Sequence, residues 1–212
     1  DKSQMDVMFN GATAIFDIGN QLSGGKLGGL LSFRDEIVMP AQSALGRIAI
    51  GLSSTFNAQH QLGDDINGVA GGLFFNDIVT SSPTVLASSN NNPASGTVSV
   101  AINNTNALQP SDYRLDFDGA AFSLVRLSDN VVVDSGFTAA GFPRAVASEG
   151  ITLSLAGGVA AGDSFLVRPV RQGANDIGVA ISTAAEIAAA GSGNALGDNS
   201  NALALAGLQQ QS

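Results

Sequence analysis

One helical stripe of apolar residues near the start of the chain constrains the fold most strongly. Apolar side chains recur every three or four positions over residues 30–56, and a helix of 3.6 residues per turn gathers them on one face. The stripe consists of Leu30, Leu31, Phe33, Ile37, Val38, Ala41, Leu45, Ile48, Ala49, Leu52 and Phe56. The pattern predicts a long amphipathic helix with this face buried.

The opposite face of this helix is polar and contains one large apolar residue, Ile50. Its other members are Asp35, Glu36, Ser43, Arg47, Ser54, Asn57 and Gln61. We expect this face to be solvated or to contact a partner. Pro40 removes one backbone donor, but the stripe keeps its phase across it, which predicts one kinked helix rather than two. The helix is predicted to begin after Gly28-Gly29 and to end before the turn-forming residues 62–68.

Two shorter elements are predicted near the ends of the chain. Apolar runs at residues 5–9 and 12–18 flank Asn10-Gly11, a dipeptide typical of a tight turn, so we expect a small β-hairpin. A helix is predicted from about residue 201 onwards, with Asp198, Asn199 or Ser200 as its cap.

The helical period is lost between residues 76 and 169, and short alternating runs replace it. These predicted strands are residues 97–102, 113–117, 122–127, 131–134, 151–155 and 164–170. Short strands separated by turn residues predict an antiparallel sandwich or barrel. The predicted fold class is α+β. A mainly helical, rod-like domain, discontinuous over residues 1–75 and 170–212, contains the kinked helix and the hairpin, and an all-β outer domain is inserted at residues 76–169.

Charge and composition exclude several classes of function. The 212 residues include 9 Lys and Arg against 18 Asp and Glu, a net charge of −9 that repels nucleic-acid phosphates and anionic lipids. The absence of cysteine excludes thiolate catalysis and thiolate metal sites. No apolar run approaches the roughly 20 residues that span a bilayer, and no secretory signal pattern opens the sequence. We expect no nucleic-acid and no membrane partner. Because the sequence starts without Met and stops within a predicted helix, we also expect a fragment of a longer protein.

No residue pattern predicts a metal site or a catalytic triad. His60 is the only histidine, and we expect it at the end of the long helix, where an imidazolium favours the negative end of the dipole. Residues 64–68 faintly resemble a calcium loop, but the first ligand position would fall on Gly63, which has no side-chain oxygen.

Aspartates of the predicted β domain could supply the two carboxyl groups of a glycosidase. The candidates are Asp112, Asp116, Asp118, Asp129 and Asp134. We favour solvated surface aspartates, because the chain has no tryptophan and only Tyr113 as a tyrosine to stack on a sugar. The glycines at 24–25 and 28–29 lack the Gly-Lys-Ser/Thr of a phosphate loop. Residues 103–105 match the glycosylation triplet, but such triplets occur by chance and imply no function by themselves. We therefore expect a protein that is not an enzyme and that has no catalytic residue and no cofactor.

Several segments, in the same order along the chain, resemble the bacterial flagellar hook-associated protein 1 family. They are GGLLSFRD at residues 28–35, PAQ at 40–42, FNAQH at 56–60, FF at 74–75, SDYRL at 111–115, AGDSFLVRP at 161–169 and GDNSNALAL at 197–205. The resemblance runs through nearly the whole chain and is loosest before residue 24 and between residues 78 and 111. Its specificity lies in the ordered combination of segments.

The resemblance implies a structural protein that is secreted through the flagellar export channel and joins hook to filament in the extracellular flagellum. Implied partners are copies of the same protein, the hook protein and the next hook-associated protein. Members of the family have terminal helical segments that form a coiled-coil inner tube and accept an export chaperone, and these segments are missing here. An alternative function is that of a surface-adhesion or carbohydrate-binding β module on a helical stalk, although few aromatic residues are present to stack on sugars.

Overall fold

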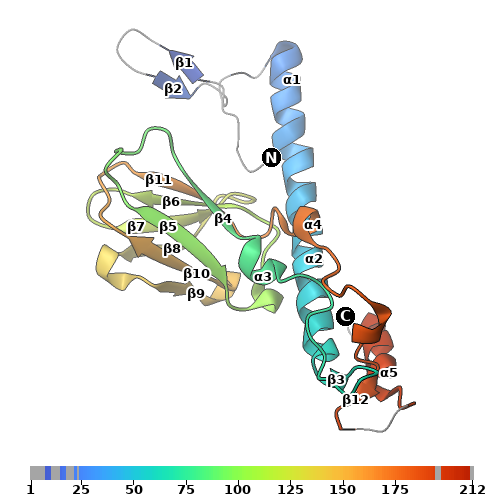
Figure 1. Cartoon of the computed structure of the whole chain (residues 1–212). Coiled ribbons are helices and arrows are strands. Elements are labelled where there is room, and N and C mark those ends of the chain that lie inside the picture. The colour runs from blue at the N-terminus through green and yellow to red at the C-terminus, as the bar shows by residue number, and fades with distance from the viewer. Residues whose placement is uncertain (1–7, 11–14, 18–21, 23, 194–196, 211–212) are drawn as a thin grey trace. The chain divides into compact units, whose positions relative to one another are not determined.

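The computed structural model describes residues 8–10, 15–17, 22, 24–193 and 197–210 (Figure 1). The chain divides into two compact units, residues 1–42 and residues 43–212, and each is described by itself below. The predicted division of the chain at residues 75/76 and 169/170 stays a prediction. The α+β fold class is confirmed, because the structure combines a long helix with antiparallel sheets.

The first unit contains the predicted hairpin and the start of the long helix. Strands β1 (Met8–Asn10) and β2 (Ile15–Asp17) pair antiparallel, which confirms the hairpin. Its predicted turn falls on Gly11, outside the described residues. Helix α1 (Gly25–Phe33) begins earlier than expected, because Gly24 is the extended N-cap residue and the later glycines continue the helix.

The helix continues across Pro40 without a break. After α1 comes a π-helical turn, η2 (Arg34–Val38), and then α2 (Met39–His60). Proline cannot donate to the carbonyl four residues earlier, and its ring crowds that carbonyl, so a widened turn just before Pro40 is the expected local response. The single helix predicted across Pro40 is therefore confirmed, with a π turn at the predicted irregularity.

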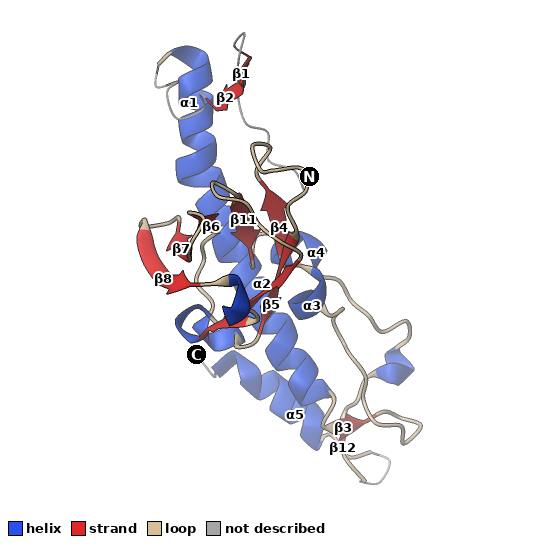
Figure 2. Cartoon of the chain, turned by 90° about the vertical axis from the view of Figure 1, so that its left-hand side faces the viewer, coloured by secondary structure: helices blue, strands red, loops and turns tan. Residues whose placement is uncertain are grey.

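Residues 84–168, called the β region here, form two antiparallel sheets (Figure 2). One sheet has the order β5-β10-β9 and the other β4-β11-β6-β7-β8. The strands are β4 (Thr84–Ala87), β5 (Thr97–Ile102), β6 (Tyr113–Phe117), β7 (Phe122–Arg126), β8 (Val131–Phe137), β9 (Arg144–Val146), β10 (Ile151–Ala156) and β11 (Ser164–Arg168). The six predicted strands are all present, and β4 and β9 were not predicted. The sheets are open, so of the two predicted architectures the sandwich is right and the closed barrel is wrong.

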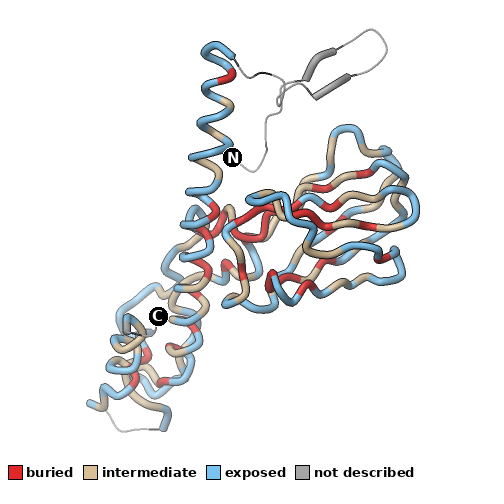
Figure 3. The backbone as a smooth tube through the Cα atoms, turned by 180° about the vertical axis from the view of Figure 1, so that it is seen from behind, coloured by how far each residue is buried: buried red, intermediate tan, exposed pale blue. Residues whose placement is uncertain are grey.

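The two sheets share one hydrophobic core because their strands alternate. In β6, Tyr113 and Leu115 are buried while Arg114 between them is exposed. Side chains from both sheets belong to the same core cluster, which also includes Ile50 of α2. Figure 3 shows burial in the strands and along α2. The β region and α2 therefore share a continuous core.

The remaining elements return along α2. Residues 63–81 and 173–210 contribute β3 (Gly63–Asp64), α3 (Ile78–Ser81), α4 (Gly173–Asp176), β12 (Ala190–Gly191) and α5 (Ser200–Gly207). In the described part of the chain, five short 3-10 helices complete the secondary structure: η3 (Thr105–Ala107), η4 (Ala139–Gly141), η5 (Ala147–Glu149), η6 (Ala184–Glu186) and η7 (Leu208–Gln210). The predicted C-terminal helix is confirmed as α5, but the N-cap residue Asn199 makes no side-chain cap bond. Among the described residues, no helix combines the length and apolar character needed to cross a bilayer.

Candidate functional site

The functional geometry of this chain centres on helix α2, which presents two different faces. Its buried residues include Ser43, Gly46, Ile50, Ser53, Asn57 and His60. Their spacing of three or four places them on one face. This is the face that the sequence analysis assigned to solvent or a partner, and that assignment is wrong for Ser43 and Asn57. The apolar exception on the polar face, Ile50, lies at the centre of the buried contact.

In the N-terminal half of α2, the helix backbone contacts the backbone of the segment after β11 at two glycines, Gly46 of the helix and Gly173 of the segment. A Cβ atom at Gly46 would lie 1.8 Å from the carbonyl oxygen of Val170, and one at Gly173 would lie 2.6 Å from the carbonyl oxygen of Gly46. Any larger side chain would force the two segments apart. The segment that leaves the β region is therefore seated directly on the backbone of α2.

Nearer the C-terminal end of α2, polar side chains hydrogen-bond the segment that enters the β region. The Asn57 side-chain oxygen accepts hydrogen bonds from the backbone N–H groups of Phe74 and Phe75, at 2.9 and 2.8 Å. The Asn57 amide donates back to the Phe75 carbonyl at 2.8 Å. Ser53 donates to the carbonyl of Asn76 at 3.2 Å. These side chains satisfy backbone groups that no strand or helix pairs.

Asn76 ties the two crossing segments to each other. Its side chain donates to the Asp176 carbonyl at 2.6 Å and accepts from the Gly178 N–H at 2.6 Å. Its backbone N–H donates to the Gly178 carbonyl at 3.0 Å. Figure 1 shows α3 and α4, which follow the two crossings, beside α2. Entry and exit of the β region are therefore joined to each other beside the helix, where Phe74 and Ser82 also bond the exit segment.

His60 ends α2, as predicted, but not as an exposed imidazolium. The ring is fully buried, its Nδ1 donates to the Gly72 carbonyl at 2.8 Å, and its Nε2 accepts from the Ala188 N–H at 3.0 Å. A ring nitrogen that accepts a hydrogen bond carries no proton, so this histidine is the neutral Nδ1–H tautomer. His60 therefore fastens the C-terminal segment to the helix, and its predicted interaction with the helix dipole is wrong.

The face of α2 that carries the predicted apolar stripe is exposed. Leu45, Ile48 and Leu52 are 58%, 64% and 51% exposed. Only the margin of the stripe is covered: Ala49 is buried, and Phe56 packs its ring against Phe74 and Phe75 with centroids 4.8 and 5.3 Å apart. Within the first unit, Leu30, Phe33 and Ile37 are exposed as well. The predicted burial of the stripe is therefore wrong within this chain.

The five candidate aspartates all accept ion pairs or hydrogen bonds from other groups of the chain. Four of them bond arginines: Asp112 bonds Arg171, Asp116 bonds Arg114, Asp129 bonds Arg126, and Asp134 bonds Arg144. The Asp118 carboxylate accepts from the backbone N–H groups of Ala120 and Ala121, and these bonds lower its pKa. Asp134 likewise has a lowered pKa because Arg144 donates to it.

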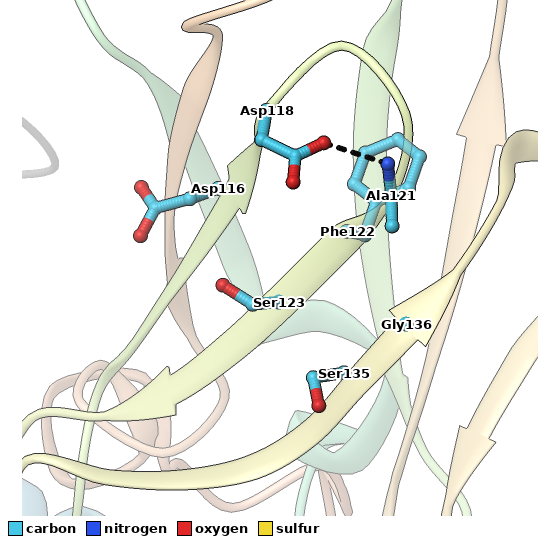
Figure 4. A pocket seen from close by; sticks show the side chains of 7 residues that line it. All are labelled: Asp116, Asp118, Ala121, Phe122, Ser123, Ser135 and Gly136. Atoms are coloured by element: carbon cyan, nitrogen blue, oxygen red, sulfur yellow. Dashed lines mark hydrogen bonds between the residues drawn. The ribbon is translucent and has the colours of Figure 1, made fainter.

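Asp116 and Asp118 line a shallow pocket with Phe122 and two serines, Ser123 and Ser135 (Figure 4). Asp116 also accepts from the hydroxyl of Ser164 at 2.8 Å. The Phe122 ring belongs to the buried core and leaves no aromatic face for a sugar.

Tyr113, the stacking residue considered for a sugar, is also unavailable. It is fully buried, and its hydroxyl donates to Glu149 at 2.6 Å. Burial and the Glu149 carboxylate raise the pKa of this hydroxyl. Tyr113 therefore serves the core of the β region.

The acidic loop after α2 is held by its own backbone. The Asp65 carboxylate accepts from the N–H groups of Asn67 and Val69, and the bond from Val69 contributes most to its lowered pKa. Asp64 accepts from the Gly193 N–H.

Across the residues that the structure describes, no three His, Asp or Glu side chains gather in an arrangement that could hold a metal ion.

Comparison with known proteins decides the family. Residues 1–75 match the family model described as the flagellar hook-associated protein FlgK helical domain, and residues 86–169 match the D2-like domain of flagellar hook-associated protein 1. The chain belongs to the flagellar hook-associated protein 1 family. The resemblance seen in the sequence is thereby confirmed.

Relatives of this hook-associated protein cover most of the chain. Flagellar hook-associated protein 1 of Salmonella typhimurium is 32% identical over 80% of this chain and 30% of its own length. The Escherichia coli protein is 33% identical over 90% of this chain and 34% of its own length. The structure of the flagellar hook junction protein FlgK from Burkholderia pseudomallei has a TM-score of 0.67 and 37% identity, and the match covers 79% of this chain and 30% of that one. The chain spans about a third of the length of these relatives.

Sequence reasoning missed the residues that attach the β region: Gly46, Ser53 and Asn76. The available signal was Ile50, a large apolar residue amid polar neighbours, which marks a second face that excludes water. Small and amide side chains on a helix give no periodic hydrophobic signal, so their contacts with backbone could not be read from the pattern.

Proposed function

We propose that this chain is part of a structural component of the bacterial flagellum that joins hook to filament. The observation that carries the proposal is the exposed apolar face of α2, formed by Leu45, Ile48 and Leu52. A monomer with no further contacts has little reason to keep large apolar side chains at helical spacing in water. The fold and family support an assembly face, and the engaged aspartates give catalysis no support.

In this proposal, the apolar face of α2 packs against helices, either from the rest of the same protein or from neighbouring copies. The spacing of three and four residues is that of a helix-packing seam. The proposed partners are further copies of the protein, the hook protein and the next hook-associated protein, in a secreted, extracellular assembly. An export chaperone would bind helical segments outside this chain.

We further propose that residues 76–169 are an outer domain inserted into a helical domain formed by residues 1–75 and 170–212. Support comes from the two crossings at α2, where Asn76 joins entry and exit, and from the family matches that end at residues 75 and 169. Limited proteolysis tests this division. Because Pro169 and Val170 are buried, we expect cleavage at the exit join only after a domain opens, whereas Asp77 at the entry join is exposed.

The assembly function is tested by Ile48→Asp in the whole protein, expressed in a bacterium that lacks its own copy. Ile48 is exposed in this chain, so the variant should fold, yet a carboxylate in a packed helical seam is strongly unfavourable. We expect fewer filaments attached to hooks and a loss of swimming. The matched control is Ala58→Asp, because Ala58 is exposed on α2 and lies about 80° around the helix from both Ile48 and Ile50.

Two results would count against the proposal. The first is normal swimming with Ile48→Asp at the same secreted level as the parent. The second is an equal loss with Ala58→Asp, because that would show that any added charge on α2 disturbs export or folding. Electron microscopy of the hook ends distinguishes missing junctions from a defective motor.

A further inference from the structure

A buried cluster of charged side chains lies where the β region meets the segment returning to α2. It consists of Asp112, which directly precedes β6, Arg168 at the end of β11, and Arg171 three residues later. The side chains of Asp112 and Arg168 are each 3% exposed, and that of Arg171 is 10% exposed. Charged groups are rarely buried to this degree without a specific partner.

The distances show which contact crosses from the sheet to the returning segment. Arg171 reaches an Asp112 carboxylate oxygen with its Nη2 at 2.5 Å, while Arg168 approaches the same oxygen with its Nε at 3.5 Å. Arg168 belongs to the same sheet as the strand that Asp112 precedes. Arg171 lies beyond the sheet, so its bond to Asp112 joins the β region to the return segment.

The neighbours of Arg171 are the residues that touch α2. Val170 before it places its carbonyl against Gly46, and Gly173 after it packs on the Gly46 carbonyl and the Ile50 side chain. Both are buried. Arg171, whose side chain binds Asp112 of the β region, therefore lies between two residues, Val170 and Gly173, whose backbone contacts α2.

A second charged network begins at Tyr113, which follows Asp112 and is the first residue of β6. Glu149 accepts from the Tyr113 hydroxyl at 2.6 Å and from Arg126 Nη1 at 2.9 Å, and Arg126 also binds Asp129. The two networks together hold three arginines and three carboxylates, so their formal charges sum to zero. Burial raises the pKa of the Asp112 carboxyl, while Arg171 and Arg168 lower it. The sheet end next to Asp112 is therefore a fixed, charge-balanced platform.

We propose that Asp112 and Arg171 act as positioning residues that fix the direction in which the β region leaves α2. Domains linked by two chain crossings move relative to each other unless a specific contact prevents it. The Asp112–Arg171 pair supplies such a contact on the exit side, in addition to the core that the β region shares with Ile50 of α2 and to the Asn76 bonds between the entry and exit segments. The β region is thereby held at a defined angle to the helix.

The test measures the distance between two spin labels, one on α2 and one on β5. The sequence contains no cysteine, so Ala58→Cys and Ser99→Cys, both at exposed positions, place the labels without further change. In the parent chain we expect one narrow distance distribution. In Arg171→Met, Arg168 still neutralises Asp112 and the sheets should stay folded, but the distribution should broaden roughly twofold or more.

Arg114→Met is the matched control, because it removes an arginine whose ion pair with Asp116 is exposed. Its distance distribution should equal that of the parent. Circular dichroism and the thermal midpoint of each variant report whether the sheets are intact. If Arg171→Met does not fold, Arg171→Lys, which keeps the charge but not the forked guanidinium, takes its place and should broaden the distribution in the same sense.

Two outcomes would overturn the proposal. One is a broad distribution in the parent chain, which would show that no fixed angle exists. The other is a folded Arg171 variant with a lower thermal midpoint but an unchanged, narrow distribution. The cluster would then only stabilise the fold.

Discussion

Gly46 and Gly51 of α2 differ sharply in what surrounds them, so alanine substitutions at the two positions can be compared directly. A Cβ at Gly46 would meet the Val170 carbonyl at 1.8 Å, whereas one at Gly51 would meet nothing within 4 Å. We expect Gly46→Ala to lower the free energy of unfolding by about 3 kcal/mol or more, because backbone must move. Gly51→Ala should raise it by about 0.5–1 kcal/mol, since alanine favours the helix. Urea denaturation measures both, and equal effects would contradict the close contact.

Asn57 is the side chain on which the entry crossing depends. Replacing it with alanine leaves the N–H groups of Phe74 and Phe75 without their acceptor in a part-buried site. We expect Asn57→Ala to cost about 2–4 kcal/mol of unfolding free energy. Arg47→Ala, at an exposed position of the same helix, should change it by less than about 0.5 kcal/mol. A small loss for Asn57→Ala would show that water or another group replaces its bonds.

The sequence could predict positions but not contact partners at this scale. His60 was correctly placed at the helix end, but its neutral state depends on Ala188, which is 128 residues away in sequence. No local pattern encodes such a pair. The same limit explains why Asn57 was assigned to solvent, because an asparagine that caps backbone and one that faces water look identical in sequence.

At the scale of elements, the hydrophobic periodicity of the sequence predicted the type and the bounds of helices and strands well. Strands β5 and β6 match their predicted ranges, because their alternation is regular and turn residues bound them. Strands β4 and β9 are four and three residues long and were missed, because so short a run shows little periodicity. The helical stripe was real, but periodicity cannot say which partner covers a face or whether that partner is part of the chain.

Asp163, in the loop between β10 and β11, makes the β region sensitive to acid through its bonds to the loop between β4 and β5. The Asp163 carboxylate accepts from the Ser95 hydroxyl and from the N–H groups of Ala160 and Asn92. These bonds, that from Ser95 first, lower the pKa of Asp163 in the folded state. The unfolded chain therefore binds this proton more readily, so the stabilisation is present above about pH 4 and is lost as pH falls through the lowered value.

Asp163→Asn tests this acid sensitivity. The amide cannot titrate, so stability between about pH 5 and pH 2 should fall less steeply than in the parent, from a lower value at pH 7. Thermal midpoints over this range measure the slope. Parallel curves for parent and variant would show that other carboxylates cause the acid loss.

At the scale of the whole molecule, α2 divides its surface between two tasks. The polar face holds the β region and the C-terminal segment, and the apolar face remains exposed. Leu45→Asp should therefore leave the isolated chain nearly as stable as the parent, within about 0.5 kcal/mol. Ile50→Asp, on the covered face, should cost several kcal/mol, because it buries a carboxylate. Denaturation of both variants compares the two faces directly, and a severe loss with Leu45→Asp would restore the burial expected from sequence.

The most direct test of the assembly face is the accessibility of position 45 before and after assembly. Leu45→Cys introduces a thiol into a chain that has none, and Ala58→Cys supplies a control at an exposed position away from the apolar face. In the isolated chain both thiols should react rapidly with a maleimide, since Leu45 is 58% exposed and Ala58 is exposed as well. In assembled flagella that carry the whole protein, with any further cysteines replaced, we expect the thiol at position 45 to be strongly protected and that at position 58 to remain reactive. Equal reactivity at position 45 in both states would contradict the account.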